Sequence, residues 1–122
     1  MTYSSAVTYL YSLQKHGIKL GLATMTELMV RLGMPQTRYR ALHIAGTNGK
    51  GSTAAIVAAV LQAAGYRVGL YTSPHLVEFR ERIRVNGNMI EESQVALLTE
   101  QLKGICGEEL SPTFFEYTTA MA

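Results

Sequence analysis

The chain has 122 residues, with 11 Lys and Arg against 9 Asp and Glu, so its formal net charge is +2. Hydrophobic residues make up 48% and charged residues 16%, which supplies a core and excludes a disordered tail. No apolar stretch reaches the roughly 20 residues of a membrane span, and the basic residues are too dispersed to indicate nucleic acid. The single cysteine, Cys106, excludes an internal disulfide and a multi-cysteine zinc site. We therefore expect one domain of a cytoplasmic protein with neither membrane nor nucleic-acid partners.

Two helices are expected in the first 35 residues. Ser4 or Ser5 can cap the first helix, which carries an apolar stripe of Val7, Leu10 and Leu13. An unusually apolar connector, 18–23, follows. Thr24 and Glu27 have the spacing of a capping box and predict the start of the second helix.

The middle of the chain reads as a strand, a glycine-rich loop, a helix and a second strand. We expect the strands at 39–45 and 67–72 and the helix at 52–64. Because this helix is apolar all round, it is expected to be buried against a sheet. The two strands are expected to be parallel, joined by a right-handed crossover. His43 would then be a histidine of the core.

Turn and capping signals organise the remainder. Ser73-Pro74 marks a tight loop, and Asn86-Gly87 between 82–85 and 89–90 predicts a hairpin. Ser93 is expected to cap a helix that ends near 104–107. Thr113 and Glu116 have capping-box spacing and predict a last helix. His75 is expected to be a hydrogen-bonded loop residue, and Cys106 is given no role. Three alternating arginines are expected to form one solvated face: Arg80, Arg82 and Arg84.

The glycine-rich loop has the chemistry of a phosphate site. Glycines let backbone N–H groups turn toward phosphate oxygens, the helix N-terminus favours negative charge, and Lys50 adds a full positive charge. The strict phosphate-loop pattern is not met, because its first glycine would fall at Ile44 and its hydroxyl residue at Gly51. A glycine-rich turn with an incidental lysine remains the alternative.

The string 43–53 (HIAGTNGKGST) resembles the nucleotide loop of the Mur ligase superfamily. Gly51, directly after the lysine, points within it to the folylpolyglutamate and dihydrofolate synthases. Segments 17–22, 71–87 and 113–117 resemble further blocks of that family in the same order. The resemblance implies a three-layer α/β/α domain with a parallel sheet, of which 1–122 would be the N-terminal part. The rest of this ATP-binding domain and a C-terminal glutamate-binding domain would lie beyond Ala122.

The resemblance also implies an activity and a set of site residues. The family uses ATP to join L-glutamate to the carboxylate of a folate or dihydropteroate through an acyl phosphate, and its full-length members are expected to be monomers. The loop would hold ATP, with Lys50 as the catalytic cation and these neighbours: Gly46, Thr47, Asn48, Gly49, Gly51 and Ser52. Ser52 would also cap the following helix, and Ser73 would contribute a hydroxyl to Mg²⁺. Folate would be bordered by Leu20, Gly21, Leu22, Thr113 and Phe115.

Two other readings stay open. The chain could belong to another Mur-type ligase that acts on a cell-wall precursor, although the 20–22 loop and Gly51 disfavour this. It could also be a nucleotide-binding module without chemistry. On the favoured reading, the family's other metal ligands and its carbamylated lysine lie beyond Ala122, so the chain alone is expected to be inactive.

Overall fold

The computed structural model describes residues 1–122, which divide into two compact units. The first unit comprises Met1–Arg40 and Ser93–Ala122, and the second comprises Ala41–Glu92. Each unit has its own set of elements and is considered by itself. None of the helices combines the length and the hydropathy that crossing a membrane requires.

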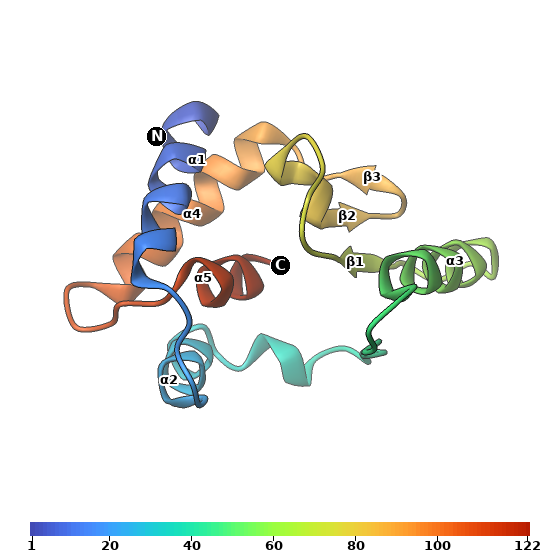
Figure 1. The fold of residues 1–122 in the computed structure, drawn as a ribbon, viewed down its shortest axis with the longest axis horizontal. Coiled ribbons are helices and arrows are strands. Elements are labelled where there is room, and N and C mark those ends of the chain that lie inside the picture. Colours follow the sequence, from blue (N-terminus) through green and yellow to red (C-terminus); the bar gives the residue numbers. More distant parts are fainter. The chain divides into compact units, whose positions relative to one another are not determined.

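The first unit is helical (Figure 1). Its elements are α1 (Tyr3–Ser12), η1 (Leu13–His16), α2 (Ala23–Arg31), η2 (Pro35–Thr37), α4 (Glu92–Cys106) and α5 (Phe114–Met121). Helix α5 packs against both α1 and α2. The core side chains come from every α-helix of the unit and from η1: Ala6, Leu10, Leu13, Leu28, Val95, Ala96, Leu102, Cys106, Phe114, Tyr117 and Met121. The helical periodicity of the sequence therefore predicted the elements of this core.

Tyr117 is the largest fully buried side chain of this core. Its hydroxyl donates a hydrogen bond to the carbonyl oxygen of Thr99, 2.8 Å away, which ties α5 to α4. The ring meets that of Tyr9 edge-on, with centroids 5.7 Å apart. Burial raises the pKa of the Tyr117 hydroxyl far above its ordinary value, so the group stays protonated and continues to donate its hydrogen bond.

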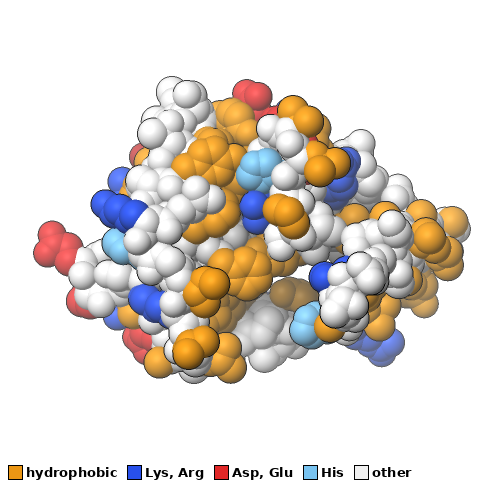
Figure 2. Space-filling view, in the orientation of Figure 1, with side chains coloured by type: hydrophobic (Ala, Val, Ile, Leu, Met, Phe, Trp, Pro, Cys, Tyr) orange, Lys and Arg blue, Asp and Glu red, His pale blue; other side chains and the backbone are white.

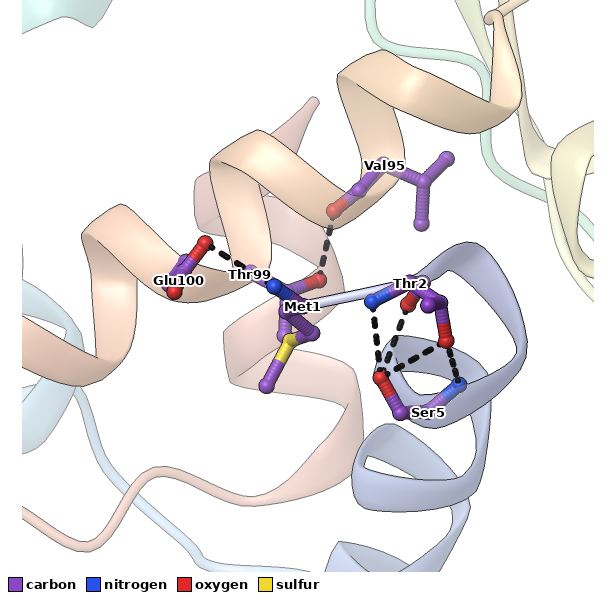
Figure 3. Close-up of polar contacts among 6 residues, drawn as sticks. All are labelled: Met1, Thr2, Ser5, Val95, Thr99 and Glu100. Atoms are coloured by element: carbon purple, nitrogen blue, oxygen red, sulfur yellow. Dashed lines mark hydrogen bonds and ion pairs between the residues drawn. The ribbon is translucent and has the colours of Figure 1, made fainter.

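Helix α1 begins two or three residues earlier than the sequence suggested. Thr2 is its N-cap, and Ser5 completes a reciprocal capping box rather than capping the helix itself (Figure 3). The N-terminal amine of Met1 lies 3.5 Å from the Glu100 carboxylate of α4. The expectation of Ser4 or Ser5 as the cap was wrong because Thr2 offers the same hydroxyl two or three residues ahead.

The two capping boxes predicted from the sequence have opposite outcomes. At α5 the Thr113 hydroxyl accepts from the Glu116 N–H at 3.1 Å, and the Glu116 carboxylate accepts from the Thr113 N–H at 3.0 Å, so that prediction is confirmed. At α2 the helix starts at Ala23 with Leu22 as N-cap and no side-chain cap, so the box predicted at Thr24 is absent. Helix α4 likewise starts at Glu92, which places the predicted cap residue Ser93 inside its first turn.

The second unit holds α3 (Lys50–Ala63), β1 (Gly69–Tyr71), η3 (Phe79–Arg82), β2 (Ile83–Val85) and β3 (Asn88–Met89). The sheet has the order β1-β2-β3 with both pairings antiparallel, and α3 packs against β1 (Figure 1). The hairpin predicted at Asn86-Gly87 is confirmed, with φ values of 50° and 83° at these two positions.

The parallel sheet predicted from 39–45 is not present. These residues form no strand, and the sheet has only antiparallel pairs. His43 is exposed and therefore is not a core histidine. Helix α3 has no buried residue, so its predicted burial was also wrong: Ile56 is 65% exposed and Val60 62%. Hydrophobic side chains lie open over this helix in Figure 2. The apolar composition of a helix indicates that its surface must be buried, but it does not show which element buries it.

Candidate functional site

The glycine-rich loop ends at the N-terminus of α3. Gly46 has φ +154° and Gly49, the N-cap of α3, has φ +75°, backbone values that favour glycine. The first intrahelical bond runs from the N–H of Thr53 to the carbonyl of Gly49, 2.9 Å. The N–H groups of Lys50, Gly51 and Ser52 precede this ladder, so they form the kind of amide cluster that binds an anion.

Lys50 lies at the first position of α3, and its exposed ammonium folds back over the loop. The Nζ atom donates to the carbonyl oxygen of Gly46 at 2.5 Å. Gly51 follows it in helical backbone, and a Cβ added there would meet no atom within 4 Å. The fold therefore does not require glycine at this position, and its effect is to leave the helix N-terminus open.

Ser52 is the third residue of α3 and does not cap it, since the N-cap is Gly49. The helix begins two residues earlier than the sequence indicated. Glycine was not expected as the cap because it supplies no side-chain acceptor, yet the left-handed turn into this helix suits it.

Ser73 follows β1 by two residues, at the carboxyl end of that strand as the sequence predicted. The N–H of Thr72 donates to the carbonyl of Arg82 at 2.9 Å, which extends the β1–β2 ladder to the residue before Ser73. Ser73 is exposed, and its bond to Pro74 is cis. This serine hydroxyl is thus presented at the edge of a short sheet.

The loop after Ser73 is held by side chains of η3. One carboxylate oxygen of Glu81 accepts from the N–H of Leu76 at 2.9 Å. The other accepts from Val77 at 2.9 Å and from Glu78 at 2.8 Å. These three amides hold the pKa of Glu81 below its ordinary value. Glu81 was not singled out from the sequence; its place three residues after Glu78 was a weak capping-box signal.

His75 in the same loop accepts a hydrogen bond at Nδ1 from the Nε of Arg82, 2.7 Å away. Its ring also meets Phe79 edge-on, with centroids 6.4 Å apart. Burial, and then the Arg82 charge, lower the pKa of His75, which keeps the ring neutral and able to accept. The expectation of a hydrogen-bonded loop histidine is confirmed, although its partner is a side chain. Arg82 is buried, so the arginines do not form one solvated face.

The residues expected to border a ring-shaped ligand lie in the first unit. Leu20 is 97% exposed and Leu22 75%, with Gly21 between them at φ +90°. The preceding Lys19 donates to the carbonyl oxygen of Ser111. Apolar side chains this exposed are costly in water unless another molecule covers them.

At the start of α5 the two phenylalanines divide their roles. Phe114 belongs to the core, whereas Phe115 is 58% exposed. Thr113 is 3% exposed, and its hydroxyl already serves as the cap of α5. Phe115 is therefore better placed than Thr113 to meet a ligand.

The structure thus groups the predicted residues within each unit. The phosphate loop and Ser73 belong to the second unit, and the apolar loop and Phe115 to the first. No cluster of three or more His, Cys, Asp or Glu side chains could hold a metal ion by itself.

Comparison with known proteins decides between the possible families. No family model matches the chain. A dihydrofolate synthase/folylpolyglutamate synthase of Bacillus subtilis is 45% identical over 125 residues, covering 98% of this chain and 29% of its own length. The crystal structure of a folylpolyglutamate synthase from Thermotoga maritima superposes with a TM-score of 0.89 at 46% identity, with 98% and 29% covered. The chain corresponds to the N-terminal part of the folylpolyglutamate/dihydrofolate synthases.

The structure of a folylpolyglutamate synthase in complex with AMPPCP and folate superposes on this chain equally well. Its TM-score is 0.89 at 33% identity, and the match covers all of this chain and 31% of that one. The chain therefore spans about 30% of the length of the folylpolyglutamate/dihydrofolate synthases it matches.

Proposed function

We propose that this chain is the nucleotide-binding N-terminal part of an ATP-dependent ligase that joins L-glutamate to a folate or a dihydropteroate. The observation that carries the proposal is its 45% identity, over 98% of its length, to a dihydrofolate synthase/folylpolyglutamate synthase. The neighbouring structure with AMPPCP and folate supports the same two ligands. In such a ligation the γ-phosphoryl group passes to the substrate carboxylate, and the glutamate amine then displaces phosphate to form the amide.

The loop 46–52 is proposed to hold the phosphates of ATP. Its amides at the start of α3 and the exposed charge of Lys50 suit an anion, and the open space at Gly51 leaves room for it. A cation is required because the carboxylate must approach an already anionic γ-phosphate. We assign Lys50 to that task, with the remaining contacts from Gly46, Thr47, Asn48, Gly49, Gly51 and Ser52.

Ser73 is proposed as a hydroxyl ligand to Mg²⁺. Ser73 is exposed at the end of β1, and no group of three or more His, Cys, Asp or Glu side chains could hold a metal ion. Such a donor set fits an ion that arrives on nucleotide phosphates and keeps several waters, as Mg²⁺ does in nucleotide sites. Bound there, Mg²⁺ would neutralise phosphate charge.

Leu20, Gly21 and Leu22 are proposed to border the pteridine or aminobenzoate rings, together with Thr113 and Phe115. The exposure of both leucines and of the Phe115 ring supports this assignment. Stacking and burial against a flat heterocycle would remove these surfaces from water.

We also propose that residues 1–122 belong to a larger α/β/α domain whose remaining residues cover α3 and pair with 39–45 as a parallel sheet. Two features support this: the exposed apolar side chains of α3, and the unpaired segment 39–45. The glutamate-binding part would then lie in the portion of the relatives that this chain does not span.

Ligand protection tests the proposal. Unfolding of the full-length protein is followed with AMPPCP, folate, dihydropteroate or a nucleotide-sugar peptide. A ligand at 100 times its Kd should stabilise the folded state by about 2.7 kcal/mol. We expect this effect from AMPPCP and from a folate or dihydropteroate. Protection by the nucleotide-sugar peptide instead would refute the proposal.

A further inference from the structure

The loop that carries Ser73 has little side-chain packing apart from His75, which meets Arg82 and Phe79. Leu76 is 92% exposed and Val77 90%, so their side chains contribute almost no burial. Loops of this kind are usually mobile because few contacts oppose their conformational entropy. A hydroxyl that must meet an ion within a few tenths of an ångström requires a different restraint.

Such a restraint is present on both sides of Ser73. Upstream, the N–H of Thr72 is bonded to the carbonyl of Arg82. Downstream, the three successive amides of Leu76, Val77 and Glu78 converge on the Glu81 carboxylate at 2.8–2.9 Å. Ser73 therefore lies on a short span between two points held by adjacent residues of η3.

The 3-10 helix η3, which carries Glu81, is anchored by buried side chains. Phe79 is 1% exposed and Arg82 7%, so the residues around Glu81 in η3 are anchored in the second unit. Hydrogen bonds from backbone amides to a charged carboxylate are stronger than those between neutral groups. Three of them converge on one side chain, in a loop where Leu76 and Val77 are almost fully exposed.

We propose that Glu81 is a positioning residue that holds the Ser73 loop in place for the magnesium–nucleotide by accepting the amides of Leu76, Val77 and Glu78. The proposal rests on the function proposed above, since that function gives Ser73 its ligand. Glu81 itself touches neither the ion nor the substrates. Its effect is to reduce the freedom of the loop before the ion arrives.

The first test needs no ligand. Hydrogen exchange is measured at the amides of Leu76, Val77 and Glu78 in the metal-free, full-length protein. In Glu81→Gln, which keeps the side-chain volume and loses the charge and one acceptor, exchange at these amides should accelerate by at least about 10-fold. Glu91→Gln is the matched control, because Glu91 is exposed and lies outside the loop, and it should leave their exchange unchanged. Unchanged exchange in Glu81→Gln would overturn the proposal.

The second test distinguishes positioning from general stability. The Mg²⁺ concentration that half-saturates thermal protection by AMPPCP should rise about 10-fold or more in Glu81→Gln, as for other groups that orient a metal ligand. The same substitution in a Ser73→Ala background should produce no further rise, because the residue through which Glu81 acts is gone. Equal rises in both backgrounds would overturn the proposal. If Glu81→Gln does not fold, Glu81→Asp, which keeps the charge on a shorter arm, takes its place.

The proposed function can fail separately. A wild-type protein that binds AMPPCP with Mg²⁺ but ligates no glutamate to folate would refute that function, while the exchange and Mg²⁺ results would still support the role of Glu81. A protein that ligates glutamate, with exchange and Mg²⁺ midpoint unaffected by Glu81→Gln, would overturn the role of Glu81 alone.

Discussion

Two leucines of the first unit differ almost completely in exposure, which gives a quantitative test. Leu28 in α2 is 0% exposed and Leu20 in the loop before α2 is 97% exposed. Truncating a buried leucine to alanine removes its transfer free energy and leaves a cavity, a combined cost of about 2–5 kcal/mol. Folding removes almost none of the Leu20 side chain from water, so its truncation loses little transfer free energy and leaves no cavity. Leu20→Ala should therefore change the free energy of unfolding by less than about 0.5 kcal/mol.

The same leucine should matter for substrate. Leu→Ala removes three carbon atoms, worth about 0.8 kcal/mol each when buried, so full cover of Leu20 by the folate rings corresponds to about 2.4 kcal/mol. Loss of that energy raises the folate Kd about 50-fold. If the folate rings bury only half of the Leu20 side chain, the Kd rises about 7-fold. Leu20→Ala is therefore expected to weaken folate binding without loosening the fold, and Leu28→Ala to do the reverse.

Native-state hydrogen exchange of the α5 amides measures the stability of the first unit, because Leu28 lies in α2 and α2 packs against α5. Calorimetric titration of the full-length protein measures the folate Kd. Equal destabilisation by both substitutions would refute the exposures on which the argument rests. An unchanged folate Kd in Leu20→Ala would refute the substrate loop.

Three further predictions concern single groups. Tyr117→Phe should destabilise the first unit by about 0.5–1.5 kcal/mol through loss of the bond to Thr99, as measured by α5 amide exchange. Because the pKa of Tyr117 is raised on folding, the wild type should lose stability as the pH rises above about 10, where the unfolded tyrosine ionises first. Tyr117→Phe should reduce this slope, and the remainder comes from Tyr9 and Cys106, whose pKa values are also raised. Thr113→Ala should cost about 1 kcal/mol at α5, where helical circular dichroism and exchange report the lost cap, and Glu116→Gln should cost less.

Another prediction is a pH effect at the Ser73 loop. Since the pKa of Glu81 is lowered on folding, its hold is complete above the ordinary pKa near 4.5 and is lost as the pH falls below that value. Protection of the three bonded amides, corrected for intrinsic exchange, should therefore fall in that acidic range. A protection factor that stays constant down to pH 3 would contradict the assignment.

Much of the first unit followed from sequence because its signals are local. The Thr113 box worked because Glu116 is three residues on and the helix starts between them. The same pattern at Thr24 failed because the helix starts two residues earlier than that cap requires and Glu27 pairs with Arg31 at 3.0 Å instead. Spacing alone could not separate these two outcomes.

The second unit was harder to predict because its pairings are not local. The segment 39–45 has the composition of a strand, yet a strand forms only where a partner is available. Glu81 was missed for a related reason: its partners are three backbone amides, and its spacing from Glu78 was only a weak capping-box signal. The positions of Ser73 and of the loop ahead of α3 were predictable because strand ends and glycine turns have sequence signals.

The most direct test of the account is a ligation assay on the full-length protein with ATP, L-glutamate and either dihydropteroate or tetrahydrofolate, with the product identified by mass spectrometry. The account predicts a product heavier by one glutamyl residue, formed only with ATP. Its rate should fall at least about 100-fold in Lys50→Ala, as when one charge-stabilising donor is removed, and remain unchanged in the exposed control Lys15→Ala. No glutamylated product with either acceptor, or equal rates in Lys50→Ala and the wild type, would contradict it.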